Sequence, residues 1–163
     1  MTEQDLELVL HWRNTPRIRN ISNSNDEIDA KNHRDWFAKL QKDSSAKAWI
    51  FEEGSRPLGF VLFNHINSQK GSARWGFYLG EEDLPRGTGS AMANLALDWA
   101  FRGLNLKTVL AECLSTNERG LKFHASRGFI DTGLKTIVER KDQSSIEVHQ
   151  LILTKEAWEK KKH

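Results

Sequence analysis

The stretch "LPRGTGSAMANLALDWAF", residues 84–101, places a glycine-containing loop directly before an apolar helical pattern. Gly87 and Gly89 allow backbone conformations that a Cβ atom would penalise, and they let backbone N–H groups approach a ligand closely. Unpaired N–H groups and the dipole at the start of a helix favour an anion, and Arg86 adds a positive charge. We therefore expect a cradle for a pyrophosphate group. The alternative for an isolated G-x-G is a plain loop before a helix.

The helical part of this stretch, residues 90–101, repeats apolar residues at helical spacing, with Met92, Leu95, Ala96 and Trp99 on one face. Such a face is expected to pack on a sheet. The glycine loop is not a signature of the common nucleotide-binding folds, because the third glycine of G-x-G-x-x-G is absent and no G-K-[ST] follows. A phosphate-bearing ligand bound here would therefore belong to another class.

A second segment with candidate chemistry follows the apolar run "KTVLAECL", residues 107–114, which is typical of a strand buried on both faces. The next segment, "STNERGLKFHASRGF", has a helical pattern in which Asn117, Leu121 and His124 share one face. Asn117 can offer a donor and an acceptor to a ligand, or it can cap the helix. His124 either faces the same ligand or is an ordinary surface or packing histidine.

The rest of the chain supplies further helices and strands around these segments. Helices are expected over residues 3–13 and 28–42, with a break at Pro16, and strands over residues 48–53, 58–66, 73–80, 136–141 and 146–154. The polar turn "DQSS" joins the last two strands as a hairpin. This order predicts an α/β (α+β) fold in which helices cover both faces of a mixed sheet. A chain of 163 residues suits one domain, residues 1–163.

The composition argues against several classes of function. The net charge is +2, from 24 basic and 22 acidic residues, which is too balanced to predict a nucleic acid as main partner. The chain shows no secretory signal pattern and no apolar run of membrane-spanning length, so no membrane partner is expected. Cys113 is the single cysteine, which predicts a reducing, cytoplasmic location. No H-x-x-x-H, C-x-x-C or carboxylate cluster indicates a metal site.

Three smaller features carry expectations of their own. The chain has six tryptophans, and we expect several to line a pocket as well as fill the core. The pair Glu81–Glu82 is expected in a solvated loop rather than as a catalytic base. The basic tail "EKKKH", residues 159–163, is expected to be a frayed, solvated end.

The glycine loop and the later helix together resemble the GNAT N-acetyltransferase family, over nearly the whole chain. The family's acetyl-CoA loop follows the pattern Q/R-x-x-G-x-G/A. "LPRGTG" matches both glycines and departs at Leu84. The resemblance implies acetyl-CoA as co-substrate, without a metal, and an oxyanion held by a backbone N–H near the end of the preceding strand. It assigns these residues to the cofactor: Leu79, Arg86, Gly87, Thr88, Gly89, Ser90, Asn117 and Phe123.

The later helix resembles the family pattern N-x-x-A-x-x-L-Y-x-x-x-G-F. Asn117, Gly128 and Phe129 match, while Gly120 replaces the usual alanine. His124 stands where the family commonly has a tyrosine that protonates the CoA thiolate. A tyrosine with a pKa near 10 stays protonated at neutral pH, whereas a histidine near 6.5 is mostly neutral. The resemblance therefore implies a catalytic His124 that protonates the thiolate, accepts a proton from the amine, or only hydrogen-bonds the sulfur.

The N-terminal half is similar to the PseH-type subgroup, through "LVLHWRNTPRIRN", "IDAKNHRDWF" and "RPLGFVLFNHI". This subgroup acetylates the 4-amino group of a UDP-linked 4-amino-4,6-dideoxy sugar in the pseudaminic acid pathway, which supplies flagellin glycosylation. The resemblance implies this UDP-amino sugar as substrate and allows a homodimer. It assigns these residues to the substrate: Arg13, His33, Trp36, Asn64, His65 and Tyr78, with Tyr78 also counted as catalytic.

Family members usually begin with a strand before a segment such as "TEQDLELVL", and this sequence begins after it. Either the first strand is absent or the start of the sequence is short, and we expect a GNAT fold with an unusual sheet edge. Two other functions remain open at this point. One is acetylation of protein N-termini, as in ribosomal-protein acetyltransferases. The other is a non-catalytic acyl-CoA-binding module, for which the departures at Leu84 and His124 leave room.

Overall fold

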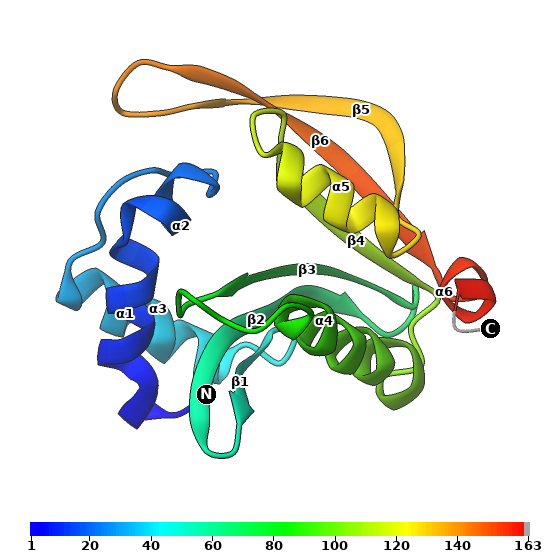
Figure 1. Ribbon diagram of the computed structural model, residues 1–163, viewed down its shortest axis with the longest axis horizontal. Coiled ribbons are helices and arrows are strands. Elements are labelled where there is room, and N and C mark those ends of the chain that lie inside the picture. Colours follow the sequence, from blue (N-terminus) through cyan, green and yellow to red (C-terminus); the bar gives the residue numbers. More distant parts are fainter. Residues whose placement is uncertain (162–163) are drawn as a thin grey trace.

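The computed structural model describes residues 1–161, and its centre is one open sheet of six strands in the order β1-β2-β3-β4-β6-β5 (Figure 1). Neighbouring strands are antiparallel except β3 and β4, which are parallel. The strands are β1 (Lys47–Glu53), β2 (Arg56–Asn67), β3 (Ser72–Leu79), β4 (Thr108–Leu114), β5 (Ile130–Glu139) and β6 (Ser145–Thr154). The predicted mixed sheet is therefore confirmed, and most of its strand pairs are antiparallel.

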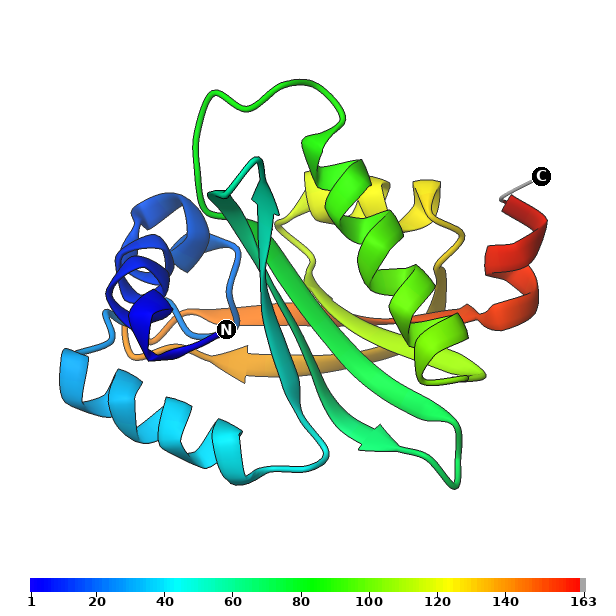
Figure 2. The same ribbon diagram turned by 90° about the horizontal axis from the view of Figure 1, so that it is seen from below.

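Helices cover both faces of this sheet, as predicted from the sequence (Figure 2). One face carries α1 (Leu6–Asn14), preceded by the 3₁₀ turn η1 (Glu3–Asp5), and then α2 (Pro16–Asn20) and α3 (Ala30–Lys42). The opposite face carries α4 (Thr88–Asp98), extended by the π-helical turn η2 (Trp99–Gly103), and α5 (Glu118–Ser126). The last helix is α6 (Lys155–Lys161). We call the first face the α1 face and the second the α4 face.

Alternation along the strands builds a separate apolar core on each face, because successive side chains of a strand point to opposite sides. On β2, Phe60 packs with Trp12 and Ile18 on the α1 face. Its neighbour Val61 packs into the larger core beneath α4, together with Met92. The helix over residues 90–101 therefore packs on the sheet, as its apolar spacing predicted.

Two expectations for element ends need correction. Pro16 was expected only to break the helical pattern, but it starts α2, because proline suits the first turn of a helix. The basic tail was expected to fray, yet residues 159–161 belong to α6. This helix is anchored by Trp158, which is 4% exposed, and by Lys161, whose Nζ donates to the Ala125 and Ser126 carbonyls. The last two residues of the tail lie outside the described residues.

The first edge of the sheet was expected to be unusual. Within the described residues, β1 is the first strand in chain order, and it forms one edge of the sheet. The amino terminus of Met1 donates to the Ala48 carbonyl at 3.2 Å, so the chain start lies beside this edge. None of the helices in residues 1–161 has the length and apolar character needed to cross a bilayer.

Candidate functional site

The parallel strands β3 and β4 separate in the middle of the sheet. They pair only from Ser72↔Thr108 to Trp75↔Ala111, although β3 runs on to Leu79 and β4 to Leu114. Figure 1 shows the two strands opening toward the side on which α2 lies. The opening, between residues 76–79 and 112–114, is called the wedge here. Backbone groups that face the wedge lack a strand partner, so they are available to a ligand.

The loop of residues 80–87 connects the wedge to the start of α4. Gly87 occupies the N-cap position with φ of 98°, in the left-handed region that favours glycine, and no side chain caps the helix there. Space within 4 Å of a Cβ at this position is empty. The unpaired N–H groups of the first turn of α4 are therefore open to an anion. Binding of a pyrophosphate at this helix start stays a prediction.

The first turn of α4 lies directly against the wedge. A Cβ built on Gly89 would come within 3.5 Å of Leu79 and 4.0 Å of Phe123, so the helix start, the strand end and α5 converge. The Ser90 hydroxyl accepts a hydrogen bond from the Arg127 guanidinium at 2.5 Å. The predicted cofactor residues on these elements are thus brought together, while Arg86 sits exposed in the loop.

Arg127 is a charged residue of this region to which the sequence analysis assigned no role. Its Nη1 donates to Asn94 at 3.2 Å, and its guanidinium lies 5.1 Å from the centre of the Phe123 ring. It therefore clamps α5 to α4 and places a permanent positive charge beside the start of α4. The sequence shows the positive charge of Arg127 itself. Its proximity to the glycine loop could not be predicted, because Arg127 lies 37 residues after Ser90 in the chain.

Asn117 acts as the N-cap of α5 in the structure. Its Oδ1 accepts a hydrogen bond from the Gly120 N–H at 2.9 Å, so the capping interpretation of this residue holds. Gly120 is needed next to it, since a Cβ there would lie 2.4 Å from the Asn117 amide nitrogen and 3.0 Å from the Cys113 sulfur. Contact between Asn117 and a cofactor stays a prediction.

His124 lies on the sheet-facing side of α5 and is 6% exposed. Its ring contacts Trp75, the last β3 residue paired to β4, and Phe77, which already lines the wedge. Phe129 packs edge-on at 5.0 Å. The histidine is thus neither a surface residue nor a free group in solvent. It sits among aromatic rings at the closed end of the wedge.

Tyr78 and Arg13 face each other across the α1 face. Tyr78 stacks on Phe60, with ring centroids 5.3 Å apart. Burial raises the pKa of the Tyr78 phenol above its usual range, although Arg13 opposes this shift, so the phenol stays protonated at neutral pH. Burial likewise lowers the pKa of Arg13. The predicted substrate residues Arg13 and Tyr78 are therefore neighbours, as expected for parts of one site.

Arg13 has an unmet hydrogen-bonding group. Its Nη2 donates to the Ser24 carbonyl at 2.8 Å, but its Nη1 is buried without a hydrogen-bond partner in the described part of the chain. A buried guanidinium N–H that lacks an acceptor costs free energy, and an anionic ligand would satisfy it. Arg19 also acts on Arg13 electrostatically, so a second positive charge lies nearby.

The other predicted substrate residues occupy different depths. His33 is 5% exposed and stacks on Trp36 at 5.2 Å, while Trp36 also meets Phe60 at 6.2 Å. The Nε2 atom of His33 is buried without a hydrogen-bond partner in residues 1–161, and burial lowers the pKa of the ring. Asn64, on β2, has a buried Oδ1 without a hydrogen-bond partner in residues 1–161. Their contact with a ligand stays a prediction.

His65 is set apart from these residues. It is exposed, and its φ of 50° lies in the left-handed region, beside the irregular pairing between Asn64 and Asn67. The geometry therefore does not bring His65 into the group around Arg13, and its role stays a prediction.

Glu112 is a charged residue of the wedge that sequence reasoning missed. The run 107–114 was expected to be buried on both faces, but its residues alternate, and only one face is fully buried. Glu112 lies just past the last β3–β4 pair and accepts hydrogen bonds from Asn23 at 3.0 Å and Gln150 at 3.1 Å. Arg74 pairs with it at 2.8 Å. The signal in the sequence was a single charge inside an apolar strand.

Arg17 connects α2 to the end of β3. Its guanidinium donates to the Leu79 carbonyl at 3.0 Å and to the Gly80 carbonyl at 2.8 Å. Next to it, Trp12 packs so closely on Gly80 that a Cβ there would lie 2.0 Å from the indole ring. The α1–α2 pair therefore fixes the end of β3 and the start of the glycine loop. Glu81 is not a free loop residue either, because it accepts the Trp12 indole N–H at 2.9 Å.

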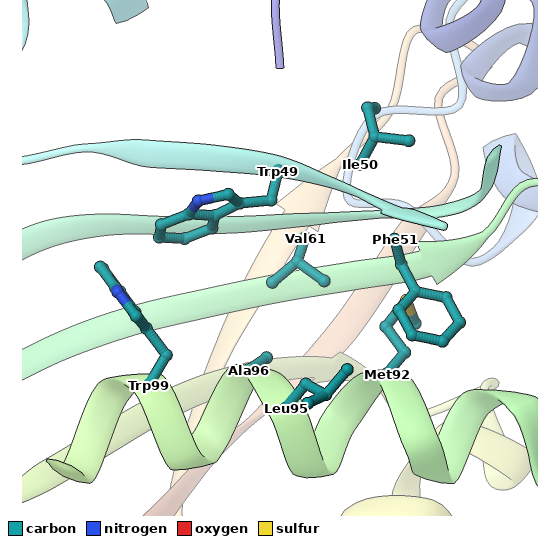
Figure 3. A pocket seen from close by; sticks show the side chains of 8 residues that line it. All are labelled: Trp49, Ile50, Phe51, Val61, Met92, Leu95, Ala96 and Trp99. Atoms are coloured by element: carbon teal, nitrogen blue, oxygen red, sulfur yellow. The ribbon is translucent and has the colours of Figure 1, made fainter. Parts of the chain in front are cut away.

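An apolar cavity of about 230 Å³ lies apart from these groups, between β1 and α4 (Figure 3). Trp49, Phe51, Met92 and Trp99 are among its lining side chains, and none of the lining residues is titratable. It cannot supply acid–base chemistry. It does confirm that tryptophans line a pocket as well as fill the core. Residues 1–161 contain no group of three or more His, Cys, Asp and Glu side chains that could hold a metal ion.

Comparison with known proteins shows the family of this chain. The profile of the acetyltransferase (GNAT) domain matches residues 1–130. The chain belongs to the GNAT acetyltransferase family. It is 28% identical over 129 residues to the acetyltransferase PseH of Campylobacter jejuni, which covers 79% of each chain. The GNAT fold and the membership in an enzyme family are thereby established, and enzymes of this family use acetyl-CoA.

Two solved structures show the same fold. A spermidine N-acetyltransferase from Vibrio cholerae, in complex with CoA and spermine, matches with a TM-score of 0.86 at 18% identity, over 97% of this chain and 94% of that chain. Campylobacter jejuni PseH matches with a TM-score of 0.70 at 22% identity, over 95% of this chain and 92% of that chain. Only the first of these structures is named for its acceptor, and both likenesses are below 25% identity, so they show the fold and do not select an acceptor.

Proposed function

We propose that this GNAT acetyltransferase transfers the acetyl group of acetyl-CoA to the 4-amino group of a UDP-linked 4-amino-4,6-dideoxy sugar, the step that serves pseudaminic acid biosynthesis and flagellin glycosylation. The observation that carries the choice of acceptor is the unpartnered Nη1 of Arg13 beside Tyr78. A nucleotide diphosphate supplies the anionic oxygens that this guanidinium lacks. The similarity to PseH supports the same choice.

The charged side chains of the α1 face bear on whether the acceptor is a nucleotide sugar or a polyamine. A polyamine is a cation, and its binding is favoured by carboxylates without competing cations. Here Arg13 lies within electrostatic reach of Arg19, and the Glu112 carboxylate is already paired with Arg74. Asp26 also acts on Arg13 electrostatically, so the case for an anionic acceptor rests on the unpartnered Arg13 Nη1 rather than on net charge. Trp36, which is half-buried, then provides an indole ring on which a uracil ring can stack.

On the α4 face, the glycine loop and the first turn of α4 would hold the pyrophosphate of acetyl-CoA. The open space beside Gly87 and the uncapped N–H groups fit that role. The pantetheine arm would fill the wedge, with Leu79 supplying the backbone N–H for the oxyanion. Arg17 fixes the Leu79 carbonyl, which leaves that strand end little freedom to move.

Glu112 is suited to receive the incoming amine. A primary amine is an ammonium ion at neutral pH and must lose a proton before it attacks the thioester. The Glu112 carboxylate lies where the wedge begins, and Asn23, Gln150 and Arg74 hold it in place. It would bind the ammonium group and pass its proton to solvent, leaving a neutral amine aligned with the acetyl carbonyl.

Thiol release from acetyl-CoA tests the proposal. The full-length protein is assayed with the UDP-4-amino sugar, with spermidine, with peptides bearing free N-termini, and without an acceptor. Turnover that depends on the UDP-sugar supports the proposal, and turnover with peptides alone replaces it by N-terminal acetylation. Binding of acetyl-CoA without turnover on any acceptor indicates a binding module instead.

A further inference from the structure

Gly76 is exposed, whereas the other residues of β3, an interior strand of the sheet, are buried or half-buried. Glycine weakens a strand interior, and its presence there often marks a bulge, a tight bend or the close approach of a ligand or of another backbone. The pairing with β2 runs without a shift from Gly59↔Leu79 to Asn64↔Arg74, so Gly76 forms no bulge. Its φ also lies outside the left-handed region, so the backbone conformation does not require a glycine.

Packing does not require a glycine at residue 76 either. A Cβ atom built on Gly76 would meet no atom within 4 Å, so no other backbone approaches this position. Gly59, on the neighbouring strand β2, is the opposite case, because a Cβ there would lie 2.8 Å from the Met92 sulfur. The fold therefore needs the glycine at residue 59, but it leaves room for a side chain at residue 76. Of the usual reasons for a strand glycine, the approach of a ligand remains.

The empty space beside Gly76 lies on the α1 face, next to the wedge. Side chains alternate along a strand, so a Cβ on Gly76 would share the face of Arg74 and Tyr78. Leu62, the partner of Gly76 on β2, packs against the core of that same face. Gly76 is also the first β3 residue beyond the last pair with β4. The space is therefore flanked by Arg74 and Tyr78 at the point where the two strands part.

The proposed acceptor needs width at this point. Its amino nitrogen is bonded to a ring carbon, and that carbon carries two further ring carbons. The terminal amine of an unbranched chain is bonded to a single CH₂ group instead. A ring-borne amine is therefore wide directly beside the nitrogen that attacks the thioester, and a side chain on β3 at the start of the wedge would collide with it.

On the basis of the proposed acetyl transfer, we propose that Gly76 is a specificity-determining residue, whose missing side chain leaves the room that a ring-borne amine occupies beside the wedge. The sugar ring lies over Gly76, while Arg13 binds the diphosphate and Glu112 receives the amine. The ion pair between Arg74 and Glu112, at 2.8 Å, fixes one side of this room. A side chain at residue 76 narrows the acceptor side alone, because the start of α4 lies on the opposite face.

Urea unfolding tests whether the space is free. Gly76→Ala and Gly76→Val add side chains that the fold has room for and that suit a strand better than glycine. The urea concentration at the midpoint of unfolding should therefore equal or exceed that of the wild type. A lower midpoint for either variant would mean that the fold itself needs the glycine, and it overturns the proposal.

Two acceptors that share the nucleotide test the selection for width. One is the UDP-4-amino sugar, and the other is UDP esterified with an unbranched 4-aminobutyl chain, which keeps the nucleotide and lacks the ring. Gly76→Val should lower kcat/KM for the sugar by about 10-fold or more, with a smaller loss in Gly76→Ala, because a few added carbon atoms discriminate by this much in a fitted site. Both variants should keep the wild-type kcat/KM for the unbranched acceptor and KM for acetyl-CoA.

Glu53→Val, at an exposed position of β1, adds a valine outside the site and should change none of these constants. If Gly76→Val loses activity equally on both acceptors, or keeps full activity on the sugar, the proposed selection is wrong. The proposed function fails in a different way. If the wild-type protein does not acetylate the UDP-sugar, that function falls and the role of Gly76 falls with it, whereas wild-type turnover of the sugar with unaltered Gly76 variants removes only the latter.

Discussion

The two halves of the site are built from different materials. On the α4 face, the proposed cofactor half consists of backbone: the ends of two parted strands, a loop with Gly87 in a left-handed conformation, and the uncapped start of a helix. On the α1 face, the proposed acceptor half consists of side chains, such as those of Arg13 and Tyr78, which come from elements far apart in the chain. Under this proposal, backbone would hold the ligand that the whole family shares, and side chains would hold the ligand that distinguishes its members.

Glu112 gives the strongest test of this comparison, because its side chain lies at the wedge, where the two halves meet. Glu112→Gln keeps the size and the hydrogen-bonding shape but removes the charge that receives the ammonium group. We expect kcat with the UDP-4-amino sugar to fall by about 10²-fold or more. The exposed Glu53→Gln on β1 is the matched control and should leave kcat unchanged. A normal kcat for Glu112→Gln would reduce Glu112 to a structural partner of Arg74.

Arg13 tests whether the acceptor half depends on one charged hydrogen bond. Arg13→Ala removes the guanidinium whose Nη1 lacks a protein partner. Hydrogen bonds to charged groups contribute roughly 1.5–3 kcal/mol, so KM for the UDP-sugar should rise by about 10- to 100-fold. KM for acetyl-CoA should stay the same. Arg34→Ala, at an exposed position of α3, supplies the control. Equal increases in both KM values would place Arg13 in the scaffold rather than in the acceptor site.

Gly87 tests the backbone nature of the cofactor half. Gly87→Ala adds no clash but strains a residue with φ of 98°. The left-handed conformation costs a residue with a Cβ about 1–2 kcal/mol, so KM for acetyl-CoA should rise by about 10-fold while KM for the sugar does not. Gly54→Ala is closely matched, since its φ is 55° and its surroundings are also empty. It should show similar strain in unfolding experiments and normal kinetics. Loss of sugar affinity in Gly87→Ala would mean that the two halves are not separable.

Arg140 tests how the acceptor half is closed. At the tip of the β5–β6 hairpin, Arg140 donates to the Ser22 carbonyl at 2.7 Å and to the Asn20 carbonyl at 3.3 Å. These bonds fix the loop after α2, which also supplies Asn23 to Glu112. Exposed hydrogen bonds contribute about 1 kcal/mol, so Arg140→Ala should raise KM for the sugar by about five-fold. Lys160→Ala on α6 is the control. A change confined to KM for acetyl-CoA would contradict this assignment.

The same division explains what the sequence could and could not predict. The glycine loop, the amphipathic pattern of α4 and the Asn117 cap are local, and each was legible from neighbouring residues. Glu112 and Arg127 were missed because their partners lie far away in the chain, at Asn23 and Ser90. Only the packing of the sheet brings such residues together.

The element ends illustrate a related limit. Pro16 has one local preference that fits both a helix end and a helix start, and only the packing of Ile18 into the core of the α1 face decides between them. Similarly, the charges of the tail indicated a solvated end, but one buried tryptophan in α6 outweighed them.

Buried histidines offer the smallest and most general test, because each half of the site holds one. Burial lowers the pKa of His33 and of His124. An unfolded histidine titrates near 6.5, so below that pH the unfolded chain binds more protons than the folded chain. The free energy of unfolding should be highest above this value, decrease as the pH falls below it, and level off once the folded histidines are also protonated.

Urea unfolding at a series of pH values measures how steeply the free energy of unfolding changes with pH. His124→Phe should make this dependence shallower, whereas His11→Gln, at an exposed position, should not. An equal slope in wild type and His124→Phe would mean that the ring is protonated as easily inside the protein as outside. In that case the aromatic surroundings of the wedge would not hold His124 neutral.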